Sequence, residues 1–341
     1  MEPQVVVGGQ VRRPFVEAAE VHCRGYSLPL QRRIVDFGAE VTFEQVPARV
    51  QEHYGIEVPS SAVRAITEGH AEQLYEQESL ATVVPVQAGV AMVVAELDGS
   101  MVPIVEMAAT AEDCRKTRTV GWHEARLSLA HAQGSVSPVF AATLGTVDEA
   151  GDQLLHCAIQ AGLGKDTQVH CVGDGAPWIV EQVQRVFGNQ ATYLLDFYHV
   201  CDYLAAAAPV CAPDQGPAWT EEQQQRLRSG QVPAVLATLE AHLEPAAATG
   251  ATPVQAGYCY LSNRLDQVDY PRALAAQLPI GSGEIESAHR YVIQERLKLP
   301  GAWWKETNAQ YMLALRTCRA NQQWKGYWDK LAKLLGLTSH F

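Results

Sequence analysis

The sequence is short of basic residues and has no long apolar run. It contains 26 Lys and Arg against 38 Asp and Glu, a formal net charge of -12. This balance argues against a protein that coats nucleic acid with its whole surface, because phosphate neutralisation needs clustered cations. No stretch approaches the roughly 20 consecutive apolar residues that span a bilayer, and residues 1–11 lack the basic and apolar blocks of a signal peptide. We therefore expect a soluble, cytoplasmic protein.

The cysteines also lack a pattern. No two of them have the spacing of a paired zinc site, and the eight stand at Cys23, Cys114, Cys157, Cys171, Cys201, Cys211, Cys259 and Cys318. We expect reduced, mostly buried thiols. What the chain does have is a basic C-terminal segment: residues 281–341 hold nine Lys and Arg against five Asp and Glu.

Three helical patterns come early in the chain, at residues 28–37, 43–53 and 60–80. Their spacing predicts an N-terminal segment, residues 1–80, that resembles a helix-turn-helix and is a candidate for DNA binding, with Arg64 as the candidate contact. A plain three-helix bundle has the same pattern, so both interpretations stay open.

An α/β pattern follows. We expect strands at residues 91–97 and 101–106, joined by a turn at Asp98-Gly99, and a third strand at 138–144. Helices and strands then alternate, which predicts a mixed sheet covered by helices, the arrangement of ribonuclease-H-like nucleases and of other α/β folds. The predicted core comprises residues 81–200 and 270–341, with a helical insertion at 201–269.

Two aspartates follow apolar strands and precede glycines. Asp98 comes after residues 91–97, and Asp174 comes after residues 168–173. An Asp-Gly pair alone is a common turn. Two carboxylates at neighbouring strand ends, joined by a third from a helix, can instead hold two Mg²⁺ ions.

Several motifs in order resemble one family. They are Asp98-Gly99, Gly173-Asp-Gly-Ala-Pro-Trp-Ile179, Leu195-Asp-Phe-Tyr-His-Val200 and Gly281-Ser-Gly-Glu-Ile-Glu-Ser287, supported by Val120-Gly-Trp-His-Glu-Ala-Arg-Leu127 and Leu297-Lys-Leu-Pro-Gly-Ala-Trp303. Together, from about Leu28 onward, they resemble the ISKra-type DDE transposases of insertion sequences. This resemblance implies a ribonuclease-H-like core interrupted by a helical insertion.

The resemblance also implies the site. Asp98 and Asp174 would be the first two metal ligands, and Glu286 the third. Glu286 is favoured over Glu284 because related transposases carry Gly-x-x-Glu here, and Gly283 stands three residues before Glu286. Asp196 and His199 resemble the Cys/Asp-x-x-His motif of related transposases, as an accessory pair near the metal or as a structural cap.

Basic and aromatic residues after Glu286 are candidates for DNA contact. They are Arg290, Arg296, Lys298, Lys305 and Trp303. Packing in the core is the alternative for Trp303, for its neighbour Trp304 and for Trp219 in the insertion.

The implied activity is metal-dependent cleavage and strand transfer at insertion-sequence ends, with two Mg²⁺ or Mn²⁺ ions. The partners would be the terminal repeats and target DNA, bound by at least a homodimer. Relatives often carry cysteine pairs ahead of the helical segment, whereas only Cys23 precedes Leu28 here, so the absence of an N-terminal DNA-binding portion stays open. A noncatalytic DNA-binding regulator and a nuclease without strand transfer therefore stay open as alternatives.

Overall fold

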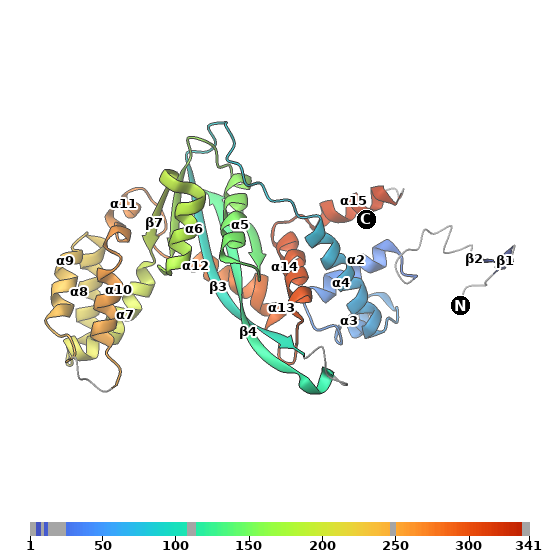
Figure 1. The fold of residues 1–341 in the computed structure, drawn as a ribbon, viewed down its shortest axis with the longest axis horizontal. Helices are drawn as coiled ribbons and strands as arrows, with labels where there is room; N and C mark the ends of the chain where they lie inside the picture. The colour runs from blue at the N-terminus through green and yellow to red at the C-terminus, as the bar shows by residue number, and fades with distance from the viewer. Residues whose placement is uncertain (1–4, 8–9, 13–24, 108–113, 246–249, 336–341) are drawn as a thin grey trace.

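The structure is a computed structural model that describes residues 5–7, 10–12, 25–107, 114–245 and 250–335. At its centre is a five-stranded mixed sheet with the strand order β5-β4-β3-β6-β7. Helices cover both faces of the sheet, and a helical arm projects beyond β7 (Figure 1). The predicted α/β class is confirmed at this level.

The sheet combines an antiparallel half with a parallel half. β3 pairs with β4 and β4 with β5 in antiparallel directions, whereas β6 is parallel to β3 and to β7. The strands are β3 (Met92–Glu106), β4 (Thr119–Ala132), β5 (Val139–Thr143), β6 (Gln168–Gly173) and β7 (Ala191–Leu195).

The predicted turn at Asp98-Gly99 is wrong. β3 runs unbroken through both residues, because Asp98 pairs with Leu127 and Gly99 with Arg126 along the full length of β4. β4 itself was absent from the prediction, although Ala125, Leu127 and Leu129 alternate toward the core, the period of a half-buried strand. The two long strands form a ribbon that extends past the covering helices (Figure 1).

The parallel register brings the two predicted aspartates to one place in the sheet. Glu96 on β3 pairs with Val172 on β6. Asp98 comes two residues after Glu96, and Asp174 comes two residues after Val172, so the two aspartates stand at the same level. β6 ends at Gly173, whereas β3 continues. Asp174 therefore stands in the loop at the carboxyl end of a parallel strand, beside Asp98.

Two helices cover one face of the sheet. They are α5 (Val147–Gln160), which begins with a capping box between Thr146 and Glu149, and α6 (Pro177–Phe187). Leu154 and Val183 from these helices pack against Leu97 on β3 in one apolar core.

On the other face, C-terminal helices pack against the sheet, and N-terminal helices pack behind them (Figure 1). The N-terminal ones are α2 (Leu28–Gly38), α3 (Val46–Tyr54) and α4 (Ser60–Glu76). The C-terminal ones are α12 (Gly283–Ala288), the π-helix η4 (His289–Gln294), α13 (Glu295–Leu297), α14 (Glu306–Ala320) and α15 (Trp324–Leu334). Ile66 of α4 and Leu313 of α14 share one core with Ile104 of β3. Full burial of each such side chain contributes about 1.5–3 kcal/mol.

The arm contains α7 (Phe197–Cys211), α8 (Gly216–Arg228), α9 (Val232–Glu240), α10 (Pro253–Ser262), the 3-10 turn η3 (Leu265–Gln267) and α11 (Tyr270–Ala275). Its core, built around Leu204, Val235 and Leu261, continues into Leu195 at the end of β7. The remaining elements are the paired strands β1 (Val5–Val7) and β2 (Gln10–Arg12) and the 3-10 turns η1 (Cys114–Thr117) and η2 (Gly188–Gln190). None of the helices in the described part of the chain is long and apolar enough to cross a membrane.

Candidate active site

A cavity of about 230 Å³ opens where β3, β6, α7 and α12 meet. It is lined by Leu97, Asp98, Gly173, Asp174, His199, Ser282, Ile285 and Glu286. The structure thus brings Asp98, Asp174 and Glu286, three residues separated by long stretches of sequence, onto the wall of one cavity.

Asp98 lies in surroundings that disfavour its charged form. Burial raises the pKa of Asp98 to about 6, and the negative charges of Asp174 and Glu286 act in the same direction. His289, the first residue of the π-helix, places its Nε2 3.3 Å from Asp98 Oδ2. Burial lowers the pKa of His289 to about 4, so this imidazole is neutral near pH 7. A bound cation would relieve the repulsion among these carboxylates.

Asp174 occupies a tight turn. Its Oδ1 accepts a hydrogen bond from the backbone N–H of Ala176 at 2.9 Å, and Gly175 between them has a φ of 74°. This left-handed conformation suits glycine, which has no Cβ. The hydroxyl of Tyr193 on β7 accepts the Gly175 N–H at 3.0 Å. The turn leaves Asp174 facing the cavity.

The two glutamates of α12 have different surroundings. Glu286 lines the cavity. Glu284 instead places Oε2 3.0 Å from Nε2 of His131, and this contact raises the pKa of His131. The geometry therefore supports the choice of Glu286 over Glu284 as the cavity-facing acid.

Asp196 and His199 form a pair at the start of α7. Asp196 is 1% exposed, and its Oδ1 accepts the backbone N–H groups of Tyr198 at 2.6 Å and His199 at 3.1 Å. Its Oδ2 accepts the Ser282 N–H at 2.6 Å and also the Ser282 hydroxyl, and it lies 3.5 Å from His199 Nδ1. Asp196 therefore caps the helix and orients His199, and it joins α7 to the segment before α12.

The protonation of this pair follows from its contacts. Burial alone would raise the pKa of Asp196, but the His199 side chain and the hydrogen bonds from Ser282 outweigh burial and hold that pKa well below its usual range. The same pairing raises the pKa of His199 to about 9, despite partial burial. At neutral pH, His199 thus brings a positive charge to the cavity wall.

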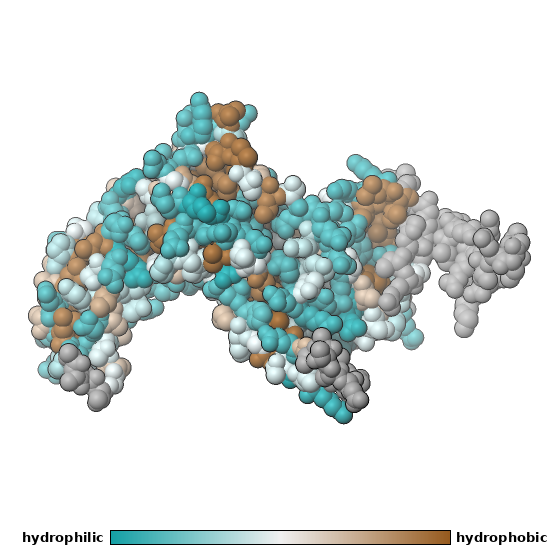
Figure 2. Space-filling view, viewed as in Figure 1, coloured by the Kyte–Doolittle hydropathy of each residue, from teal (hydrophilic) through white to brown (hydrophobic). Residues whose placement is uncertain are grey.

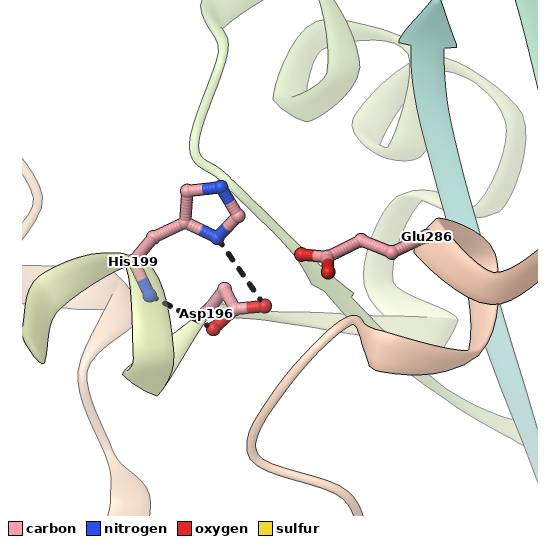
Figure 3. A group of neighbouring side chains, drawn as sticks. All are labelled: Asp196, His199 and Glu286. Atoms are coloured by element: carbon pink, nitrogen blue, oxygen red, sulfur yellow. Dashed lines mark hydrogen bonds and ion pairs between the residues drawn. The ribbon is translucent and has the colours of Figure 1, made fainter. Parts of the chain in front are cut away.

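Asp196, His199 and Glu286 could together hold a metal ion, provided that His199 first loses its extra proton. One ligand atom from each lies within 4.8 Å of the others, and Figure 3 shows His199 and Glu286 facing each other from α7 and α12. Both oxygen atoms of Asp196 already accept hydrogen bonds, so a cation here would compete with them. Asp98 and Asp174 extend the acidic wall beyond this group.

Glu96 is a buried acid that the sequence analysis missed. It is 2% exposed, and its Oε2 accepts the backbone N–H of Ile285 at 2.8 Å. Burial raises the pKa of Glu96 to about 8, with Glu284 and Asp196 adding to the rise. The bond ties α12 to β3 beside the cavity. The sequence feature that could have pointed to Glu96 is its position as the single acid within the apolar run 91–97.

Arg296, a predicted DNA contact, requires correction. It is 2% exposed, its Nε donates to the carbonyl of Gly38 at 2.9 Å, and its guanidinium lies between the rings of Phe43 and Trp304. Arg296 therefore joins α13 to the N-terminal helices and offers no surface to DNA. Trp304 is likewise buried, at 4% exposed.

The other predicted DNA contacts lie at or near the surface. Trp303 is 48% exposed, and the guanidinium carbon of Arg118 lies 3.3 Å from its ring centroid. Lys298 is half-buried and donates to Ser100 Oγ at 2.9 Å. The remaining candidates Arg64, Arg290 and Lys305 are exposed, whereas Trp219 is half-buried against the arm core.

Compared with family models and with curated proteins, the chain matches none. We therefore infer function from the geometry of the cavity and from the motifs that line it. The described neighbours to which sequence reasoning gave no role are His289, Ser282 and Glu96. His289 lies beside Asp98, Ser282 bonds Asp196, and Glu96 bonds the backbone of Ile285 next to Glu286.

Proposed function

We propose that this protein is a metal-dependent enzyme that cuts and joins DNA strands, in the manner of the DDE transposases that its motifs resemble. The observation that carries the proposal is the single cavity lined by Asp98, Asp174 and Glu286. The order and directions of the strands, with three antiparallel strands followed by two parallel ones, fit a ribonuclease-H-like core.

The acids fit divalent metal ions. Carboxylate oxygen atoms are the ligands that Mg²⁺ and Mn²⁺ prefer. The pKa of Asp98 is raised mainly by burial and further by the charges of Asp174 and Glu286, and a bound cation would offset both effects. Asp98, Asp174 and Glu286 would hold two such ions, which when bound activate an attacking oxygen and stabilise a leaving oxygen at phosphorus.

His199 contributes a different function. Its imidazolium faces the cavity and can donate a charged hydrogen bond to a phosphate oxygen, holding a DNA strand beside the acids. Asp196 supports this by pairing with Nδ1, which leaves Nε2 to face a ligand. The accessory pair thus acts in substrate binding, and the three acids in metal binding.

The shape of the molecule offers a path for DNA. The surface is hollowed between the arm and the ribbon of β3 and β4 (Figure 2). Lys298 and the Arg118–Trp303 stack add cations and an aromatic face near the ribbon. Two element ends need two sites, so the working form is proposed to be a homodimer or larger assembly on DNA.

The test is Mg²⁺- or Mn²⁺-dependent cleavage and joining of a labelled duplex that carries the inverted sequences flanking the coding region. The unmodified chain is compared with Glu286→Gln and, as the matched control on the same helix, Glu284→Gln. We expect cleaved and joined products that only Glu286→Gln abolishes. Cleavage without joining would assign a nuclease, and DNA binding without either reaction would assign a regulator.

A further inference from the structure

The position of Asp174 depends on contacts from outside the central sheet. β6 ends at Gly173, so the turn of residues 174–176 has no strand partner to hold its carbonyl groups. Buried carbonyls require partners, and those of Asp174 and Gly175 find them on the helical arm.

Two side chains of the arm bind successive carbonyls of this turn. The Tyr260 hydroxyl on α10 donates to the carbonyl oxygen of Asp174 at 2.6 Å. Two residues past α10, Nε of Arg264 donates to the carbonyl oxygen of Gly175 at 3.0 Å. Both donors lie more than eighty residues along the chain from the turn they hold.

The two donors are themselves held in place. Tyr260 stacks on Tyr203 of α7 with ring centroids 4.2 Å apart and planes at 21°. The Arg264 guanidinium lies 4.5 Å from the Tyr260 ring centroid, and its Nη1 donates to the Tyr260 carbonyl at 3.0 Å. These contacts limit the rotamers of both side chains, so the arm presents a preorganised pair of donors.

The turn fits closely against this pair. A Cβ placed on Gly175 would lie 2.5 Å from Arg264 Nε, so only glycine allows the approach. On the opposite side, Tyr193 accepts the Gly175 N–H. The backbone that carries the Asp174 carboxylate is thus gripped between β7 and the arm.

We infer that Tyr260 and Arg264 are positioning residues for Asp174, and that the helical arm is thereby a working part of the cavity. The expected change in metal affinity rests on the proposed function, whereas the hydrogen bonds from Tyr260 and Arg264 to the turn do not. Residues that orient a metal ligand change metal affinity by roughly 10- to 100-fold when they are removed.

The experiment uses the full chain and conservative variants. Tyr260→Phe removes only the hydroxyl, and Tyr258→Phe is its control, because Tyr258 is half-buried on the same helix against the same arm core. Arg264→Lys keeps the charge but removes the planar fork. Its control is Arg226→Lys, because Arg226 bonds Glu222 and Thr238 within the arm.

Mn²⁺ affinity is measured by titration calorimetry with the metal alone, beside thermal unfolding. We expect Tyr260→Phe and Arg264→Lys to weaken Mn²⁺ binding about tenfold at a nearly unchanged Tm, while both controls match the unmodified chain. Parent-like Mn²⁺ affinity in Tyr260→Phe would overturn the inference.

A second measurement separates this inference from the proposed function. Amide hydrogen exchange is followed at Ala176, whose N–H bonds the Asp174 carboxylate. We expect Tyr260→Phe to speed this exchange by up to about tenfold, and Tyr258→Phe to leave it unchanged. If the unmodified chain binds no Mn²⁺, the metal proposal fails, and exchange alone decides the inference; unchanged exchange at Ala176 would then reject it.

Discussion

Asp98 and Asp174 line the same cavity, but they are supported by different parts of the molecule. Asp98 lies within a paired strand and next to the buried His289 of the π-helix. Asp174 stands beyond the end of its strand, and its turn is held by Tyr260 and Arg264 of the arm. One acid is therefore built into the core, whereas the other depends on a peripheral helical unit.

This difference separates stability from site geometry. Contacts on the core side, such as the bond from Ile285 to Glu96, join elements that share the largest apolar core. Contacts on the arm side hold the short turn of residues 174–176. Loss of these contacts leaves the arm core around Leu204 and Leu261 intact. Loss of the contacts on the core side is expected to destabilise the fold. Loss of the contacts on the arm side is expected to reduce function without destabilising the fold.

The largest expected effect treats the two acids alike. If the proposed function holds, Asp98→Asn and Asp174→Asn should each reduce DNA cleavage by roughly 10³-fold, since each would remove a proposed metal ligand worth several kcal/mol. Single-turnover cleavage with Mg²⁺ measures the loss. Asp166→Asn, an exposed aspartate before β6, is the control and should retain parental rates. A large loss at only one of the two acids would show that they do not form one centre.

The next effect distinguishes the supports by stability. Glu96→Ala should lower the free energy of unfolding by about 1–3 kcal/mol, because the buried Ile285 N–H loses its acceptor. Urea denaturation followed by circular dichroism measures this change. Tyr260→Phe, in contrast, should unfold near the parental midpoint. Equal destabilisation by both changes would remove the distinction between core and arm.

A pH dependence sharpens the same contrast. The pKa of Glu96 in the folded state is raised to about 8 from 4.5, so the fold favours the protonated carboxyl. The stability that this protonated carboxyl contributes is complete below pH 4.5 and is lost as pH rises toward 8. The free energy of unfolding should therefore fall by about 1 kcal/mol between pH 6 and 7, and Glu96→Gln should remove this part of the slope. Urea titrations at both pH values provide the measurement, and identical slopes in the two proteins would contradict it.

The smallest expected effect is on the salt dependence of DNA binding, and it is tested at Lys298. Lys298→Met loses the bond to Ser100 Oγ and one positive charge. If Lys298 also meets a phosphate, the slope of log affinity against log salt should fall by about 1, for every duplex sequence tested. Fluorescence anisotropy at several KCl concentrations measures the slope. An unchanged slope would restrict Lys298 to its bond with Ser100.

Local sequence patterns predicted much of the fold and of the acidic wall. The α/β class and the strands β6 and β7 followed from periodicity, whereas the set Asp98, Asp174 and Glu286 came from the family resemblance, and Asp98 lies within a strand and not in the predicted turn. β4 was missed because its apolar alternation is clear only from Ala125 onward, while Trp122 to Glu124 interrupt the pattern.

The missing parts share a physical cause. Arg296 is a charged residue of a type that usually lies at the surface. Its burial depends on contacts with Gly38, Phe43 and Trp304, and the first two of these are distant in sequence. Tyr260 and Arg264 act on backbone carbonyls, which are the same in every residue and leave no sequence signature. Patterns along a chain reveal faces of helices and strands, but not pairings between a side chain and a remote backbone.

The π-helix His289–Gln294 has a consequence for the permitted length of the chain. A π turn accommodates one residue more than an α turn, so it shifts the helical phase of everything that follows. If the same six residues wound as a regular α-helix, the later residues would rotate by about 100°. Arg296 would then leave its aromatic slot, and Lys298 would leave Ser100. A one-residue deletion in this stretch should thus be tolerated far better than a one-residue insertion, because only the deletion lets a regular helix keep Arg296 and Lys298 on their present partners.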